Sequence, residues 1–469
     1  MLTIETLFPA PSDAMRAALE AAPRSLMAVN AAINYQQSLA LDDPRYESTT
    51  QARAEQFEHR FHSRFNYNRA TGEFAPPQQG KHVLFFGHVG CGKSTELTQL
   101  CHQLHHPDRY WVVRVDLLNM IDPSDARYSD VWLAVAERLV AQLQAEQIPV
   151  SDVVLNRLRN WFSERVLVSE SLQDLNASVQ SEAEVGGGIP FVGKLLAKFT
   201  STIRFGSTHR DTLRTVVQNT YAEFVGAMNL LVAEVTEQLQ ALGRGQRVLF
   251  AIDGTDRFKG DDWRRLFVED ANQLVMVNAI AVYTVPMALK SCGARLDLFE
   301  TIVLPMIKLH EFSAGRSRRE AAYRTLRAIV LKRCHHSLFE DLAALDALIT
   351  WSGGHLRDAL RLLNYACASA ETPTLRRADV DAAAQELAYD YRDWLHADHY
   401  PVLAAAMRDP DNTGTSDTIT MLVERSALLE YNTGSWRLPH PVITLLQGYQ
   451  RAAAAASTAD GSPAAAAKA

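Results

Sequence analysis

The amino-acid sequence predicts an α/β protein: a three-layer domain with a five-stranded parallel sheet, followed by a helical lid and a small winged-helix-like C-terminal domain. Two observations lead to this fold class. Short, continuous apolar runs alternate with longer stretches of helical periodicity, as in a parallel sheet covered on both faces. A glycine-rich segment directly follows the first apolar run and leads into a helical pattern.

The apolar runs define five strands. Each is bounded by polar or turn-forming residues and is short enough for a strand. The expected strands are 82–86, 111–118, 247–253, 279–286 and 301–309. A crossover helix is expected at 129–146, between the second and third strands.

The chain divides into five regions. Residues 1–75 are expected to form an N-terminal helical region that ends at a Pro-Pro-Gln-Gln-Gly break. The others are the sheet domain at 76–312 with a helical insertion at about 150–245, the lid at 313–372, the winged-helix-like domain at 373–450 and a disordered tail at 451–469. Leu428–Leu438 contains two alternating runs around Asn-Thr-Gly-Ser, which predicts a hairpin. The tail is mostly Ala, Ser, Gly and Pro with almost no large apolar side chain, which favours disorder.

Composition excludes several classes of protein. The chain has 47% hydrophobic and 22% charged residues, typical of a globular protein, and its net charge of −7 provides no global basic field for nucleic acid or anionic lipid. The five cysteines are scattered without metal-ligand spacing, which favours a reducing compartment. No basic-then-apolar leader and no transmembrane-length apolar run occurs, so the expected location is cytoplasmic.

Residues 87–94 match the phosphate-binding pattern G-x-x-x-x-G-K-[ST] at every fixed position, which makes the domain a P-loop domain. Glycines let backbone N–H groups curl around a phosphate, and the following helix adds its positive N-terminal dipole. Lys93 is expected to reach the β- and γ-phosphates of ATP, and the Ser94 hydroxyl to ligate Mg²⁺. The expected nucleotide-binding residues are Gly87, His88, Val89, Gly90, Cys91, Gly92, Lys93, Ser94 and Thr95. For Cys91, a small side chain in a tight turn is the favoured interpretation over redox chemistry.

A carboxylate is expected beside this loop. The apolar run Val248–Ile252 ends in Asp253, which is predicted to be the carboxylate on the Mg²⁺ side. Asp256 follows within three residues and is a candidate to orient or deprotonate the attacking water, although a role as a turn former is the alternative.

Two further polar groups are candidates to contact the γ-phosphate. Thr284 lies at the carboxyl end of the fourth strand, the end that faces the ligand crevice in a parallel sheet; an ordinary strand threonine is the alternative. Arg357 lies in the first turns of a helix that follows Gly353 and Gly354, and is expected to reach the phosphates from the lid. Arg361, one turn later, is expected to pair with Asp358 or solvent instead.

The sequence resembles the AAA+ and STAND (signal-transduction ATPases with numerous domains) divisions of P-loop ATPases. The resemblance spans roughly residues 80–445 and rests on the phosphate loop, Asp-Gly-Thr-Asp-Arg at 253–257, the polar fourth strand and Gly-Gly-His-Leu-Arg-Asp-Ala-Leu-Arg-Leu-Leu at 353–363. The last motif is similar to the sensor-two helix of origin-recognition-like initiator ATPases.

The resemblance implies ATP and Mg²⁺ bound between sheet and lid, with Lys93, Ser94 and Asp253 as ligands and Thr284 and Arg357 as sensors one and two. It implies ATPase activity, and assembly as a homo-oligomer or control of a protein effector. Asp256 stands three residues after Asp253 instead of next to it, which implies slow hydrolysis. Arg295, just before the fifth strand, occupies the AAA+ position of an arginine finger, in an unremarkable segment.

Two functions remain open. The first is an ATP-dependent molecular switch, which the similarity to bacterial STAND-like ATPases places in anti-phage defence. The second is a DNA-acting initiator or loader. Residues 373–450 contain six Arg and no Lys against eleven acidic residues, and the expected recognition helix near 418–426 has one Arg and one Glu, so charge does not support DNA binding. A small-molecule kinase is disfavoured because a sensor-like lid is present and no acceptor pocket is evident.

Two local features have alternative interpretations. The segment from Val185 through three glycines into an amphipathic helix is interpreted as a loop entering a packed helix, in preference to a membrane or partner contact. His440 lies between two prolines after the predicted hairpin. In STAND ATPases a winged-helix histidine contacts the β-phosphate of ADP; packing beside Trp436 is the favoured alternative here.

Overall fold

In the computed structural model, residues 3–53, 56–162, 188–205, 210–312, 316–431 and 436–460 are described. For residues 457–460 only the backbone is described. Five strands form one parallel sheet in the order β2-β3-β4-β1-β5. They are β1 (Lys81–Gly87), β2 (Tyr110–Asp116), β3 (Arg247–Asp253), β4 (Ile280–Pro286) and β5 (Glu300–Val303). The predicted α/β class and five-stranded parallel sheet are confirmed.

Alternating residues of the strands face two separate hydrophobic cores. Leu84 and Phe86 of β1 face the core that contains α6 (Tyr128–Ala145) and α11 (Tyr221–Ala241). Val83 and Phe85 face the other core, with α4 (Phe57–Arg64) and α5 (Lys93–Leu104). A strand buried on both faces has no polar side, which is why these runs are continuously apolar.

The fifth strand is shorter than predicted. It ends at Val303, whereas the apolar run continues to residue 309. Beyond the strand, the Met306 N–H donates to Glu430 O (3.4 Å) and the Lys308 N–H donates to Ala52 O (3.2 Å). Pro305 has no N–H for a strand ladder, so the chain leaves the sheet there.

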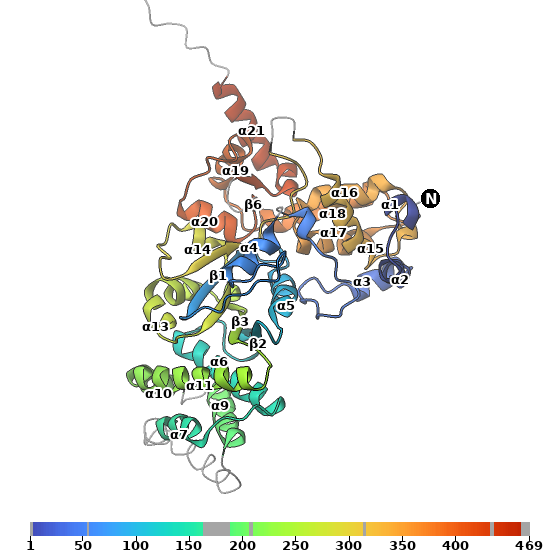
Figure 1. Cartoon of the computed structure of the whole chain (residues 1–469). Coiled ribbons are helices and arrows are strands. Elements are labelled where there is room, and N and C mark those ends of the chain that lie inside the picture. The colour runs from blue at the N-terminus through green and yellow to red at the C-terminus, as the bar shows by residue number, and fades with distance from the viewer. Residues whose placement is uncertain are drawn as a thin grey trace, which may run out of the picture.

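The insertion between β2 and β3 is helical, as expected. It contains α7 (Asp152–Trp161), α9 (Ile189–Arg204), α10 (Arg210–Asn219) and α11, which lie together at one end of the molecule (Figure 1). In the described part of the 185–200 segment, α9 has Pro190 in its first turn and buries Leu195, Leu196 and Phe199. This agrees with a loop entering a packed helix; residues 185–187 lie outside the described part.

The lid contains α15 (Glu320–Leu331), α16 (Leu342–Ser352) and α17 (Leu356–Ser369), and α18 (Arg377–Arg392) packs on α16 and α17. The N-terminal helices join this group. They are α1 (Ile4–Leu7), α2 (Asp13–Glu20) and α3 (Leu26–Ala32), and α3 packs on α17 (Figure 1). A short 3₁₀ turn, η1 (Thr50–Ala52), packs on α15.

The C-terminal part combines helices with the predicted hairpin. Helices α19 (His399–Arg408) and α20 (Asp417–Glu424) precede β6 (Leu428–Tyr431) and β7 (Trp436–Pro439), which pair antiparallel. The four residues of the predicted turn, 432–435, lie outside the described part. Helix α20 packs on α14 (Met287–Ser291), directly after β4.

The predicted disordered tail is wrong for its first half. Helix α21 spans Gln447–Asp460 and packs on α19. The lack of large apolar side chains does not prevent a helix here, because alanine is the strongest helix former and a small side chain suffices for close packing against a neighbouring helix. Residues 461–469 lie outside the described part. Within the described residues, none of the helices is both apolar and long enough to cross a membrane.

Candidate nucleotide-binding site

The phosphate loop connects the carboxyl end of β1 to the first turn of α5. Gly90 and Gly92 have φ values of +88° and +94°, which side chains rarely tolerate. A Cβ on Gly87 would lie 2.8 Å from Lys93 Cγ. Glycine is therefore required here both by backbone conformation and by the space that the lysine occupies.

Lys93 is buried at the centre of the loop, with 3% of its surface exposed. Its ammonium group donates to Gly87 O (2.7 Å) and His88 O (3.0 Å) and forms an ion pair with Asp256 Oδ2 (2.8 Å). The lysine is thus folded back on its own loop and on one acidic partner. A phosphate that arrives in the loop would compete for the same three hydrogens.

The two predicted carboxylates occupy different positions. Asp256 lines the pocket together with Lys93, whereas Asp253 ends β3 beside Asp116 of β2 and does not line the pocket. An Asp253 oxygen accepts the Gly254 N–H (2.9 Å). The structure therefore brings Asp256, not Asp253, into direct contact with the P-loop lysine.

The pKa values of the two aspartates shift in opposite directions. Burial and the nearby charge of Asp256 raise the pKa of Asp253, although hydrogen bonds from Ser94 and Thr284 act against this. Burial would also raise the pKa of Asp256, but the charge and hydrogen bond of Lys93 lower it overall. Asp256 is thus the more firmly ionised of the pair, and Asp253 is the one whose charge a cation would stabilise.

Thr284 lies behind the acidic pair. It is fully buried and does not line the pocket. Its hydroxyl accepts the Gly254 N–H (2.9 Å) and donates to Asp256 Oδ1 (3.4 Å), while the Thr255 hydroxyl donates to Thr284 O. In this structure Thr284 positions the 253–256 turn.

The remaining predicted loop residues divide into two groups. Val89, Gly90, Gly92, Ser94 and Thr95 line the pocket, whereas Gly87, His88 and Cys91 do not. The Thr95 hydroxyl accepts the Leu39 N–H (3.2 Å). Cys91 is buried in the core on the α5 side of the sheet, which agrees with a structural role.

The lid reaches the phosphate loop at the start of α17. The His355 ring lies 2.8 Å from Val89 O through Nε2, and the Arg357 N–H donates to Gly90 O (3.1 Å). The Arg357 side chain lines the pocket, and its Nε is buried without a hydrogen-bond partner in the described structure. Burial and the charge of Arg257 lower the pKa of Arg357. An anion in the pocket would satisfy this guanidinium.

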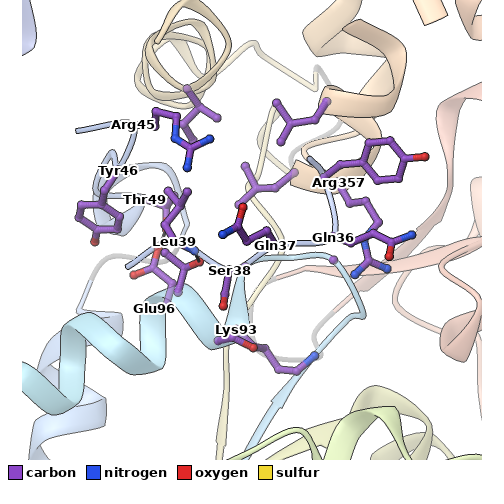
Figure 2. Close-up of a pocket in the computed structure, with 18 of the residues that line it drawn as sticks. Gln36, Gln37, Ser38, Leu39, Arg45, Tyr46, Thr49, Lys93, Glu96 and Arg357 are labelled. Atoms are coloured by element: carbon purple, nitrogen blue, oxygen red, sulfur yellow. Dashed lines mark hydrogen bonds between the residues drawn. The ribbon is translucent and has the colours of Figure 1, made fainter. Parts of the chain in front are cut away.

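An N-terminal segment that carries no recognisable motif completes the pocket. Figure 2 shows Gln36, Gln37, Ser38 and Leu39 running across the pocket between the P-loop region and the lid, with Arg45, Tyr46 and Thr49 farther along the segment. Besides the Leu39 contact with Thr95, Gln99 Nε2 on α5 donates to Leu41 O (3.1 Å). These hydrogen bonds fix the segment on α5, so the pocket lies between sheet, lid and N-terminal region.

Arg53 is a structural contact that sequence inspection missed. Its side chain is 1% exposed and donates to Cys91 O (2.5 Å), to Thr49 Oγ1 (2.7 Å) and to Pro305 O. It therefore ties the phosphate loop to the N-terminal segment. No spacing in the sequence marks an arginine 38 residues upstream of its partner.

His440 and Arg361 meet at a buried aspartate in the lid. Asp358 Oδ2 lies 3.2 Å from His440 Nε2 and accepts the Tyr391 hydroxyl (2.9 Å), and Arg361 pairs with Asp358 Oδ1 (3.1 Å). Of the two partners expected for Arg361, Asp358 and solvent, the structure shows Asp358. His440 does not line the pocket, and its ring stacks on Tyr391 at 5.0 Å. Packing is thus the role that the structure shows, with Asp358 and Tyr391 as neighbours.

Arg295 is exposed in the loop before β5 and does not line the pocket.

Comparison with known proteins finds no matching family model and no matching curated sequence. Solved structures do match. A Walker-type ATPase of Pyrococcus abyssi is 11% identical, with 83% of this chain and 94% of that chain covered and a TM-score of 0.38. Cdc6p of Pyrobaculum aerophilum is 11% identical (87% and 99% covered, TM-score 0.32), and the ORC2 protein of Aeropyrum pernix, solved as ADPNP–ADP complexes, is 10% identical (92% and 98%, TM-score 0.32).

The order of the strands around the site and the position of the lid identify the type of fold. β4 lies between the strand that leads into the phosphate loop and the strand that ends in Asp253, and a helical lid contacts the loop from above the carboxyl edge of the sheet. This strand order and the lid over the loop make the fold a P-loop α/β fold of the AAA+ type. The pocket fits a nucleotide phosphate chain, because glycines with positive φ, a buried lysine and an unpartnered buried arginine Nε converge there.

Proposed function

We propose that this protein binds MgATP between sheet and lid, hydrolyses it slowly, and uses the nucleotide as a molecular switch. The observation that carries the proposal is that a single pocket is lined by the P-loop lysine, by Arg357 of the lid and by the 35–49 segment. A ligand in this pocket would contact three parts of the chain at once. Its binding energy would therefore depend on how those parts are arranged, which is what a switch requires.

Each side chain has a role that its position supports. The loop N–H groups, Lys93 and Arg357 bind the phosphates by charge-assisted hydrogen bonds. Ser94 and Asp253 are the residues that would hold Mg²⁺, which supplies charge neutralisation at the phosphate oxygens when bound. Asp256 would orient the attacking water once Lys93 has turned to the phosphates.

The alternative function is that of a DNA-acting initiator or loader ATPase. The order of sheet, helical lid and C-terminal hairpin domain is equally that of the initiators that this sequence resembles. Against it, α20, the expected recognition helix, packs on α14 of the sheet domain, and residues 373–450 are net acidic. Titration of labelled duplex DNA at low salt separates the two: binding weaker than micromolar supports the switch.

The resemblance to STAND-like ATPases extends the proposal to bacterial anti-phage defence, with a homo-oligomer or a protein effector as the partner. A nuclease, protease or membrane effector encoded next to this gene would support that extension.

The nucleotide assignment is tested with Lys93→Ala. Loss of the lysine charge should weaken binding of a fluorescent ATP analogue by about 100-fold, since charge-assisted contacts to phosphate are lost. Lys259→Ala removes an exposed lysine that does not line the pocket and serves as the control.

Lys93→Ala also leaves Asp256 buried without its partner, which by itself destabilises the fold. The double variant Lys93→Ala/Asp256→Asn removes that unpaired charge. Affinity equal to that of the wild type in both variants, with folding verified by circular dichroism, would refute the assignment.

A further inference from the structure

The side chain of His88, the second residue of the phosphate loop, points away from the pocket and into the C-terminal part of the molecule. Its Nδ1 lies 3.1 Å from Val423 O at the end of α20, and its Nε2 accepts the Glu430 N–H of β6 at 2.9 Å. The ring is 2% exposed. One loop residue therefore bonds two separate elements more than 330 positions away in the sequence.

The partners fix the protonation of the ring. A carbonyl oxygen only accepts, so Nδ1 must carry the hydrogen; a backbone N–H only donates, so Nε2 must be unprotonated. His88 is thus a neutral imidazole with both nitrogens used. The ring therefore couples its two partners: if it rotates or moves with the phosphate loop, its hydrogen bonds to Val423 O and to the Glu430 N–H are broken.

Glu430 is the point at which the C-terminal hairpin is docked on the sheet domain. Besides the contact with His88, its carbonyl accepts the Met306 N–H (3.4 Å), and its carboxylate, on a residue that is 2% exposed, pairs with Lys290 (2.7 Å) and Arg437 (2.8 Å). Lys290 belongs to α14, which follows β4. Loosening of His88 would therefore act on the residue that anchors the hairpin.

The other end of the link is Lys93. The same residue whose ring binds the C-terminal part presents its carbonyl to the lysine ammonium at 3.0 Å. A lysine that turns to bound phosphate gives up this carbonyl, and the His88–Val89 peptide loses one of its restraints. The nucleotide site and the docking point are then joined through a single residue.

We propose that His88 is a positioning residue through which occupancy of the nucleotide site loosens the seating of the β6–β7 hairpin. This inference rests on the proposed function, because it requires that the pocket binds nucleotide. It adds the route by which the bound state reaches the C-terminal domain.

Hydrogen exchange measured by mass spectrometry on the full chain tests the link. Peptides covering residues 419–431 are followed with and without Mg²⁺ and a non-hydrolysable ATP analogue, at concentrations shown by direct titration to saturate each variant. In the wild type, the analogue should speed exchange of the Glu430 amide. In His88→Asn, which keeps a donor near the Nδ1 position but has no acceptor near Nε2, exchange should be about tenfold faster already without nucleotide, and the analogue should change it no further.

Two variants serve as controls. His88→Gln keeps an acceptor near the Nε2 position and should retain slow exchange at Glu430 without nucleotide. His82→Asn removes another buried histidine, at the start of β1, whose ring contacts Tyr283 Oη (3.0 Å) and Val277 O (3.1 Å) instead, and should keep the wild-type response.

The outcomes are separable. If the wild type does not bind the analogue, the proposed function fails and the inference fails with it. If it binds and exchange at 419–431 is unchanged, or if His88→Asn responds to the analogue as the wild type does, the inference alone is overturned.

Discussion

Lys93 and Asp256 form the pair on which the chemistry of the site depends. The lysine ammonium has one acidic partner at 2.8 Å and two carbonyl partners. A bound phosphate would have to replace these partners. Asp253 precedes Asp256 by three residues, at the end of β3, and its pKa is raised by burial and by the charge of Asp256. The two aspartates therefore differ: Asp256 is paired with Lys93, whereas Asp253 has no cationic partner among the described residues.

This difference predicts distinct phenotypes for the two amide substitutions. Asp256→Asn should slow ATP hydrolysis by about 100-fold while changing ATP affinity by less than about fivefold, because it removes a carboxylate that would orient water. Asp253→Asn should additionally raise the Mg²⁺ concentration needed for half-maximal binding, since it removes a charge on the metal side. Steady-state hydrolysis and Mg²⁺ titrations of binding measure both.

Wild-type turnover in Asp256→Asn would make this residue only a former of the 253–256 turn. The base would then have to be sought among other groups of the pocket.

At the scale of elements, the phosphate loop is held by three parts of the chain. The N-terminal region contacts Cys91 O through Arg53, the lid contacts Val89 O and Gly90 O, and the C-terminal hairpin domain contacts the ring of His88. These hydrogen bonds from three parts of the chain restrain the conformation of the phosphate loop. Helix α4 packs on α5 and β5 and adds Phe57 and Phe61 to the core on that side of the sheet, so it matters for stability more than for chemistry.

Helix α4 contains a buried histidine that makes stability depend on pH. His62 is fully buried, both ring nitrogens are without hydrogen-bond partners in the described structure, and burial lowers its pKa to about 4. Glu58 opposes this shift, while Arg69, Arg109 and His59 add to it. The unfolded chain, with a pKa near 6.5, binds a proton that the folded chain does not, so stability is complete above about pH 6.5 and is lost as pH falls towards 4.

We therefore expect His62→Leu to be more stable than the wild type at pH 7 by about 1 kcal/mol, because an unpaired buried polar group is removed. The advantage should grow by up to about 3 kcal/mol on acidification to pH 4. Urea unfolding at several pH values measures it. A constant difference between the two proteins across this range would contradict the low pKa.

At the scale of the whole molecule, the site is assembled from residues that are distant in the sequence. The pocket residues run from Tyr35 to Leu360, and the link through His88 extends this to Glu430. Short segments from the N-terminal region, the sheet domain and the lid thus meet at one site.

ATP-dependent self-association follows as the prediction at this scale. With a non-hydrolysable analogue, light scattering should show a mass at least twice that of the nucleotide-free protein, and Arg295→Ala should reduce hydrolysis without reducing affinity by more than about threefold. Arg295 is exposed and outside the pocket of its own chain, so such an effect would act between copies. A monomer in every nucleotide state would instead favour a closed switch that opens on an external trigger.

The sequence by itself determined the sheet and the phosphate loop, because these depend on local patterns: apolar runs and fixed glycine spacing. For Arg361 it left two partners open, Asp358 and solvent, and the structure shows Asp358. The sequence also indicated the hairpin after α20. It misjudged the end of the fifth strand and the Ala-rich tail, where the deciding factors were a missing proline N–H and packing against α19.

Only the tertiary structure decided which carboxylate meets Lys93, that residues 35–49 complete the pocket, and that His88 and Arg53 hold the loop from outside. These contacts join positions from 38 to more than 330 residues apart. No periodicity or spacing records such distances, since they arise from how the lid and the C-terminal hairpin pack on the sheet. The residues of the phosphate loop can be recognised from a motif. The residues that connect this loop to the rest of the chain, such as His88 and Arg53, are determined by tertiary packing.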